Sequence, residues 1–248
     1  MIKFGIRASI LAILVVLGIS GSPNAYAGEL HDAVKAGDIV RVQAALASGA
    51  DVNELDLYGT ALQTAAALGS LEITKALIDA GANLEAEGEP ARSHPLHAAA
   101  KTNQAAVAIM LVERGAQVDA RDGEGRTPLI IAAMNTNFDV AKALLSHGAD
   151  PKARDTIYGD TTLHAAAGSG DLEIVTLLLS SGVDVNVRST SNGDTPLFYA
   201  ADLGLLEMVK FLAANGADLS ITNKAGATAM KEASDPAKEL LRSLGLKE

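Results

Sequence analysis

Histidines and one short acidic loop are the candidates for catalytic or metal-binding groups in this chain. No two histidines stand four residues apart, the spacing at which one face of a helix presents two imidazoles to a zinc ion. Asp119, Asp122 and Glu124 lie close together around Gly123, but their loop lacks the twelve-residue ligand pattern and the closing glutamate of a calcium-binding hand. We therefore expect no metal site and interpret these acids as solvated loop residues. The five histidines are His31, His94, His97, His147 and His164.

Signatures of enzyme active sites and cofactor sites are missing from the sequence. The chain has no cysteine, which excludes a thiol nucleophile, a cysteine-based zinc site and an iron–sulfur cluster. It also lacks the G-x-S-x-G nucleophile elbow, the H-E-x-x-H zinc motif, the P-loop and the glycine fingerprint of dinucleotide-binding proteins. We therefore expect neither enzyme activity nor a bound cofactor.

The stretch at 159–186, GDTTLHAAAGSGDLEIVTLLLSSGVDVN, shows which elements carry these residues. Thr161 suits the N-cap of a short helix, because its hydroxyl can accept a bond from an otherwise unpaired backbone N–H. Gly170 then ends this helix, since glycine adopts a positive φ at little cost. From Leu172 to Ser180 the apolar residues recur at helical spacing, which predicts a second helix that stops at Gly182.

This two-helix unit recurs along nearly all of the chain after residue 28. The leucine of its first helix returns every 32 to 34 residues, at Leu30, Leu62, Leu96, Leu129, Leu163 and Leu197, and Met230 takes that place in a final degenerate copy. The glycine after the second helix keeps the same period, at Gly49, Gly81, Gly115, Gly148, Gly182 and Gly216. A period of about 33 residues with the pattern T-P-L-H-x-A is typical of ankyrin repeats. Segments such as Thr127-Pro128-Leu129, Pro95-Leu96-His97-Ala98-Ala99 and Thr195-Pro196-Leu197 match that pattern, so residues 29 to 245 resemble the ankyrin repeat family.

The resemblance implies an all-α fold, an ankyrin-repeat solenoid of about six to seven helix-turn-helix repeats connected by β-hairpin-like fingers. Each repeat then buries its faces only against its neighbours. It also implies that His31, His97 and His164 bridge backbone groups of adjacent fingers. The expected organisation is a signal peptide at 1–27 and a repeat domain at 28–248, with repeats at 28–56, 57–86, 87–122, 123–155, 156–189 and 190–222 and a C-terminal cap at 223–248.

Departures from the family pattern predict local irregularities. Asn103 and Thr136 replace the glycine that closes the first helix. Asparagine tolerates the left-handed conformation, but a β-branched threonine does not, so we expect a non-standard turn at Thr136. The finger at 85–93 is longer than the others, and Ile130 stands in place of the usual histidine.

The N-terminal residues 1–27 have the pattern of a signal peptide. Lys3 and Arg7 precede an apolar run at 8–19, which is shorter than the roughly 20 residues of a membrane span. The alternative is a membrane anchor that stays uncleaved. Without a cysteine or a twin arginine, we expect general secretion to the periplasm, or secretion as the alternative. The expected cleavage site comprises Ala25, Ala27 and Gly28.

The charge balance limits the kinds of partner. The chain has 20 basic and 30 acidic residues, and loss of Lys3 and Arg7 leaves 18 and 30, a formal charge of −12. This charge argues against nucleic acid as a partner, because phosphate binding needs a basic patch. It is compatible with a basic protein partner, and equally with acidity that serves solubility alone.

A surface for protein binding is the remaining candidate site. In ankyrin proteins the fingers and the exposed face of the first helices line a concave groove. Exposed tyrosines beside arginines are typical of interface hot spots; in the alternative, Ile131 and Met134 only pack between repeats. The residues carried over to this groove are Tyr58, Leu68, Lys101, Arg121, Arg126, Ile131, Met134, Tyr158, Arg188, Tyr199, Asp202 and Leu203.

Four functions fit these observations to different degrees. The first is a monomeric periplasmic module that binds another protein as a scaffold or as a protector in stress tolerance. The second is an immunity or inhibitor protein that neutralises a toxic periplasmic enzyme, such as a lipase or a wall hydrolase. A secreted effector is a third, although a general-secretion signal alone leaves the chain in the periplasm. An enzyme is disfavoured, because Lys101, Ser169 and Asp202 fall on different repeats.

Overall fold

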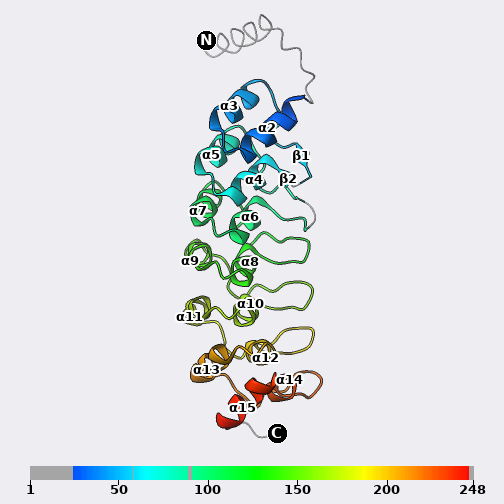
Figure 1. The fold of residues 1–248 in the computed structure, drawn as a ribbon, viewed down its shortest axis with the longest axis vertical. Helices are drawn as coiled ribbons and strands as arrows, with labels where there is room; N and C mark the ends of the chain where they lie inside the picture. The colour runs from blue at the N-terminus through cyan, green and yellow to red at the C-terminus, as the bar shows by residue number, and fades with distance from the viewer. Residues whose placement is uncertain (1–24, 58, 89–90, 246–248) are drawn as a thin grey trace, which may run out of the picture.

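The computed structural model describes residues 25–57, 59–88 and 91–245. In this part of the chain, pairs of short helices stack along one long axis, with the N-terminal pair at one end and the C-terminal pair at the other (Figure 1). The first helices of the pairs form one layer and the second helices form another. The fingers project from the layer of first helices. Each pair therefore contacts only its neighbours, as a solenoid requires.

The two layers are built from helices of four to eleven residues. The first helices are α2 (Ala25–Lys35), α4 (Ala61–Leu68), α6 (Pro95–Lys101), α8 (Pro128–Met134), α10 (Thr162–Ser169), α12 (Pro196–Asp202) and α14 (Ala229–Glu232). The second helices are α3 (Ile39–Ala47), α5 (Leu71–Asp79), α7 (Ala105–Glu113), α9 (Phe138–Ser146), α11 (Leu172–Ser180), α13 (Leu206–Ala214) and α15 (Asp235–Ser243).

The core is a strip of leucines and alanines that runs through every repeat. The leucine of each first helix is at most 1 % exposed, from Leu30 in α2 to Leu197 in α12. Each such burial contributes about 1.5–3 kcal/mol of hydrophobic free energy. A pair of fully buried alanines follows, such as Ala166 and Ala167 in α10. Their small side chains let the backbones of successive first helices approach closely.

The turns between paired helices follow the expected chemistry, with one correction. Thr161 is the N-cap of α10, and Gly170 ends that helix with a φ of 78°. The expectation of a non-standard turn at Thr136 is wrong. Thr136 adopts a φ of 55°, and the N–H of Asn137 donates to the carbonyl of Ala132 at 2.9 Å, closing the turn as in the other repeats.

Packing overrides the local preference at Thr136. The side-chain amide of Asn137 donates to the carbonyls of Ala100 and Lys101 in the preceding repeat, at 2.8 and 3.0 Å. These bonds hold the residue after Thr136 against α6, so the threonine accepts a left-handed conformation that costs about 1–2 kcal/mol.

The fingers are narrow antiparallel loops. The finger after α3 contains the strands β1 (Leu55–Asp56) and β2 (Gly59–Thr60). In it Leu55 pairs with Thr60 and Asp56 with Gly59. Later fingers close with single bridges between Gly88 and Ser93, Arg154 and Thr161, and Thr222 and Thr228. The fingers thus bring residues from successive repeats to one edge of the stack.

Most of the expected signal peptide, residues 1–24, lies outside the described residues. The first described helix, α2, begins at Ala25, so cleavage before Gly28 would remove its first three residues. Within 25–57, 59–88 and 91–245, none of the helices combines the length and the apolar character that crossing a membrane requires.

Candidate partner-binding groove

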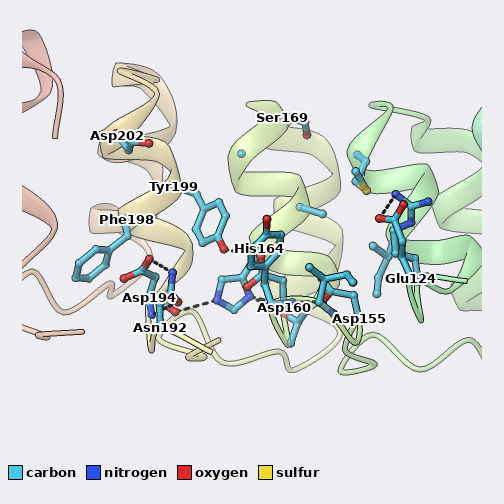
Figure 2. A pocket seen from close by; sticks show the side chains of 18 of the residues that line it. Glu124, Asp155, Asp160, His164, Ser169, Asn192, Asp194, Phe198, Tyr199 and Asp202 are labelled. Carbon is cyan, nitrogen blue, oxygen red and sulfur yellow. Dashed lines mark hydrogen bonds and ion pairs between the residues drawn. The ribbon is translucent and has the colours of Figure 1, made fainter. Parts of the chain in front are cut away.

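An open cavity of about 550 Å³ lies between the fingers and the first helices of the fourth, fifth and sixth repeats. Figure 2 shows it from close by, with side chains from α10, α12 and the neighbouring fingers around it. Met134 of α8 borders one side, and Tyr199 and Asp202 of α12 border the other. The cavity therefore lies where the resemblance places a binding groove.

The cavity exists because α10 carries small residues at positions where its neighbours carry large ones. Ala165 and Gly168 line the cavity on α10. In register with the buried leucines, α12 has Tyr199 and Asp202 at these two positions, and α8 has Ile131 and Met134. Because Gly168 has no side chain and that of Ala165 is short, α10 leaves a hollow between the longer side chains of α8 and α12. Sequence reasoning overlooked this hollow, although the register of the repeat contains the signal.

Tyr199 forms an ordered wall of the cavity. Its hydroxyl donates to Asp160 Oδ2 at 2.5 Å, and its ring stands edge-on to the imidazole of His164 at a centroid distance of 5.5 Å. Figure 2 shows the ring pointing from α12 toward these two residues. Burial, supported by the bond to Asp160, raises the pKa of the Tyr199 hydroxyl far above its usual range. The phenol is therefore a neutral donor at pH 7.

Asp160 keeps one carboxylate oxygen without a donor. Its Oδ1 is buried and has no hydrogen-bond partner in the described part of the chain, whereas Oδ2 accepts from Tyr199. Burial raises the pKa of the Asp160 carboxyl, and the Tyr199 bond offsets this in part. A buried oxygen that lacks a donor is costly, because desolvation is not compensated. Because this oxygen is buried, a ligand in the cavity cannot reach it, so Asp160 contributes negative charge to the site rather than a free acceptor.

The lining of the cavity is strongly acidic. Arg126 is held by Asp122 and Glu124, with ion-pair distances of 2.8 Å to each. Asp155 accepts from three backbone N–H groups of its own finger, and among the described residues the Asp202 carboxylate has no hydrogen bond or ion pair. Among the described residues, one arginine, Arg126, lines the cavity with six carboxylic acids, which are Glu124, Asp155, Asp160, Asp194, Asp202 and Glu232.

The buried histidines of the repeat pattern connect adjacent fingers, as expected. His164 Nδ1 accepts from the N–H of Thr161 at 3.1 Å, so Nε2 carries the proton and donates to the carbonyl of Asp194 at 3.1 Å. His97 makes the same pair of bonds, to the N–H of His94 at 3.3 Å and the carbonyl of Arg126 at 2.9 Å. Burial lowers the pKa of both imidazoles to about 4. They are therefore neutral structural groups at pH 7.

Two further side chains connect adjacent fingers in this way, and sequence reasoning missed both. Gln63 stands at the histidine position of the second repeat, where its Oε1 accepts from the N–H of Thr60 at 2.7 Å and its Nε2 donates to the carbonyls of Ala86 and Ser93. His94, which looked isolated in its finger, lies within 3.2 Å of the carbonyls of Glu85 and Arg121. A side-chain amide has the same donor and acceptor as a neutral imidazole, which is the signal that could have identified Gln63.

Arginines form a second set of bonds between fingers. Arg121 Nη1 donates to the carbonyl of Arg154 at 2.6 Å, and Arg154 Nη1 donates to that of Arg188 at 2.9 Å. Arg188 Nη2 continues the series to the carbonyl of Thr222 at 2.6 Å. The guanidinium groups of Arg121 and Arg188, expected to contact a partner, therefore also hold neighbouring fingers together.

The structure gathers some of the expected groove residues around the cavity and separates others. Leu68 on α4 and Lys101 on α6 lie away from the cavity. Leu203 directly follows α12 and does not line the cavity. Ile131 is only 8 % exposed, so it packs between repeats, whereas Met134 is 48 % exposed. Tyr58 lies outside the described residues. The expected residues that line the cavity are Arg126, Met134, Tyr158, Tyr199 and Asp202.

The interpretation of the acidic loop as solvated is wrong for Asp122, which has a structural role. Asp122 is 7 % exposed and accepts from the N–H groups of Glu124 and Arg126, both at 2.9 Å, besides its ion pair with Arg126. In the part of the chain that the structure describes, no group of three histidine, aspartate or glutamate side chains could hold a metal ion.

Comparisons with known proteins agree with this architecture. The human ASB11 ankyrin repeat domain is similar, with a TM-score of 0.77 and 24 % identity over 88 % of this chain and 98 % of that one. The ankyrin repeat domain of Bcl-3, a member of the IkappaB protein family, has a TM-score of 0.73 and 28 % identity over 86 % and 97 %. These similarities confirm the expected ankyrin-repeat solenoid. No curated protein sequence matches the chain.

The family model described as ankyrin repeats (3 copies) matches residues 30–122, 91–155 and 154–223. Together these matches extend over most of the chain. Ankyrin repeats are protein–protein interaction modules, typically without enzymatic activity. The chain belongs to the ankyrin repeat family.

Proposed function

We propose that this chain is exported to the periplasm and binds another protein through the groove around the cavity, as a scaffold or protector in stress tolerance. The single observation that supports binding at this place is the hollow on α10. It opens beside exposed apolar and aromatic side chains: Met134 is 48 % exposed, Tyr158 is 57 % exposed and Ile157 is 54 % exposed. Large exposed side chains around a concavity are the usual anchors of an interface.

Export rests on the sequence of residues 1–27 alone. The positive start, the apolar run and the small residues Ala25 and Ala27 support a cleaved signal. Fractionation after osmotic shock, with an antibody against the repeat domain, tests this part of the proposal. Recovery of an uncleaved chain in the membrane pellet would contradict it.

The second candidate function is immunity to a periplasmic toxin. The six carboxylic acids that line the cavity favour it, because an acidic groove complements a basic enzyme surface and accelerates association. An inhibitor of this kind covers the active site of a lipase or a wall hydrolase. Inhibition of such an enzyme by the purified repeat domain separates this function from a scaffold, which binds without blocking activity.

The groups that an enzyme would need are occupied or far apart. The Ser169 hydroxyl donates to the carbonyl of Ala133 at 3.0 Å, so it is engaged in packing α10 against α8. Lys101 lies on α6, and Asp202 lies on α12. A nucleophile and its base must lie within hydrogen-bond reach of each other. This separation supports a binding function over catalysis.

Filling the cavity tests the proposed interface. Gly168 has an ordinary helical backbone, and a Cβ at this position meets Tyr199 Cδ1 at 3.7 Å, an ordinary contact. Gly168→Met should therefore fold, because α8 already carries Met134 in the same register, and it should occlude the groove. Thr176→Met on the outer helix α11 is the matched control, since Thr176 is exposed and faces away from the cavity.

The assay is capture of periplasmic proteins on immobilised residues 28–248, quantified by mass spectrometry. We expect Gly168→Met to lose at least tenfold of the specifically captured protein, a loss equivalent to about 1.4 kcal/mol. Thr176→Met should capture as much as the native chain. Equal capture by all three chains would place the interface outside this groove.

A further inference from the structure

We propose that the cavity on α10 binds the guanidinium of an arginine side chain, presented by a basic segment of the partner protein. This inference rests on the proposed function and specifies the chemistry that the groove recognises. Three features carry it: the charge of the lining, the free carboxylate of Asp202, and the shape of the hollow beside Tyr199.

The charge of the lining selects a cation. Six carboxylic acids face the cavity, and the one arginine among the described lining residues, Arg126, is already paired with Asp122 and Glu124. His164 adds no positive charge, because it is neutral at pH 7. The potential inside a concave acidic site is focused by its low-dielectric walls, which strengthens attraction for a positively charged group.

One carboxylate of the lining is free to accept from a ligand. Asp202 is exposed, lines the cavity and has no hydrogen bond or ion pair among the described residues. Asp155 Oδ1 already accepts from three backbone N–H groups, and Glu124 is paired with Arg126. A bound group would therefore donate toward Asp202 on α12, which Figure 2 labels above Tyr199, while Asp160 adds negative charge below it.

The shape of the hollow favours a planar cation over a spherical one. Tyr199 stands along one side, and Ala165 and Gly168 line the hollow beside it. A guanidinium can stack on the face of an aromatic ring and still donate from its edge, which an ammonium cannot do with the same geometry. The rigid fork of N–H donors can also pair with both oxygens of one carboxylate, such as that of Asp202, which the three donors of a lysine ammonium match less well.

A peptide titration tests the inference directly. The probe is an acetylated and amidated hexapeptide of alternating arginine and glycine, added to ¹⁵N-labelled residues 28–248. We expect amide chemical-shift changes concentrated at 155–169 and 192–203, which contain the cavity residues of α10, α12 and their fingers. The same peptide with citrulline in place of arginine keeps the shape and loses the charge. It should bind at least tenfold more weakly.

Variants of the lining complete the test. Asp160→Asn keeps an acceptor for the Tyr199 hydroxyl, and Asp202→Asn changes an exposed residue, so both should fold. Each should weaken arginine-peptide binding by about three- to tenfold, the range for the loss of one carboxylate charge at a half-exposed site. Glu173→Gln on the outer helix α11 removes the same charge from the same repeat and should change binding by less than twofold.

Three outcomes would overturn the inference. They are equal binding of the citrulline peptide, equal binding of a lysine–glycine hexapeptide, and binding by Asp160→Asn and Asp202→Asn that is no weaker than that of Glu173→Gln. If partner capture is lost in Gly168→Met while the arginine peptide fails to bind, the groove function stands and this inference is wrong. If the peptide binds as expected while capture is unchanged in Gly168→Met, the proposed function is wrong.

Discussion

Replacing His97 and His164 by glutamine should remove a large part of the acid sensitivity of this solenoid. Both imidazoles are at most 2 % exposed, and burial lowers the pKa of each to about 4. An imidazole in the unfolded chain titrates near its ordinary value of about 6.5. The folded state therefore binds these two protons only at much lower pH than the unfolded state.

The direction and size of the change in stability with pH follow from this difference in pKa between the folded and unfolded states. Because the unfolded state binds more protons between pH 6.5 and 4, the stability that is fully present above pH 6.5 is lost as the pH falls toward 4. A change in pKa from 6.5 to about 4 corresponds to roughly 3 kcal/mol for each histidine. The two lie in different repeats and share no partner, so their contributions should add.

Glutamine is the appropriate replacement because the protein already uses it. Gln63 accepts from the N-cap N–H with Oε1 and donates to the next finger with Nε2, the same pattern that His97 and His164 show. His97→Gln and His164→Gln should therefore remain within about 1 kcal/mol of the native chain at pH 7. Between pH 6.5 and 4, the double variant should lose roughly 6 kcal/mol less than the native chain does.

The assay is urea unfolding followed by circular dichroism at pH 7, 6, 5 and 4. Burial raises the pKa of Asp160 and Asp119, so the folded state binds protons at these carboxyls more readily than the unfolded state does. This opposes the loss of stability at low pH, and it does so equally in every variant. His147→Gln is the control, because its imidazole bonds within the turn of α9 rather than between fingers. If the double variant and the native chain lose the same stability over this interval, the buried histidines are not the origin of the acid sensitivity.

Two further predictions concern the scaffold. Thr136→Gly should raise the free energy of unfolding by about 0.5–1 kcal/mol, because it relieves a φ of 55° at a β-branched residue. Asn103→Gly, at a φ of 59°, is the comparison and should gain less, and no gain at Thr136 would show that the turn is unstrained. Arg154→Met should lower stability by about 1–2 kcal/mol, since it removes bonds to the carbonyls of Gly159 and Arg188. Hydrogen exchange should then accelerate in both fingers, and unchanged exchange would contradict a role in holding them.

The local elements could be read from the sequence because each depends on nearby residues. The cap at Thr161, the stop at Gly170 and the helix from Leu172 to Ser180 all appear in the structure where the pattern predicts them. Caps, left-handed stops and apolar spacing act within one or two helical turns, so a single repeat contains the whole signal. The period of the leucines then predicts the stacking.

Contacts between repeats could not be read in the same way. Thr136 adopts a left-handed conformation because Asn137 bonds to α6, one repeat away. Each arginine of the series donates to a carbonyl that lies 33 or 34 residues further along the sequence. Which donor meets which carbonyl at such separations depends on how closely the repeats stack, and no local pattern specifies that distance.

The candidate site likewise combines features that the sequence predicts with features that depend on contacts between repeats. From the residue types alone came the family, the acidic character, and a set of groove positions that includes Tyr199 and Asp202. Only the stacked chain placed Asp160 beneath Tyr199 with one oxygen unpaired and opened the hollow at Gly168 between two helices with longer side chains. A cavity is a difference between neighbouring surfaces, so it arises when the repeats are packed together and not within any one of them.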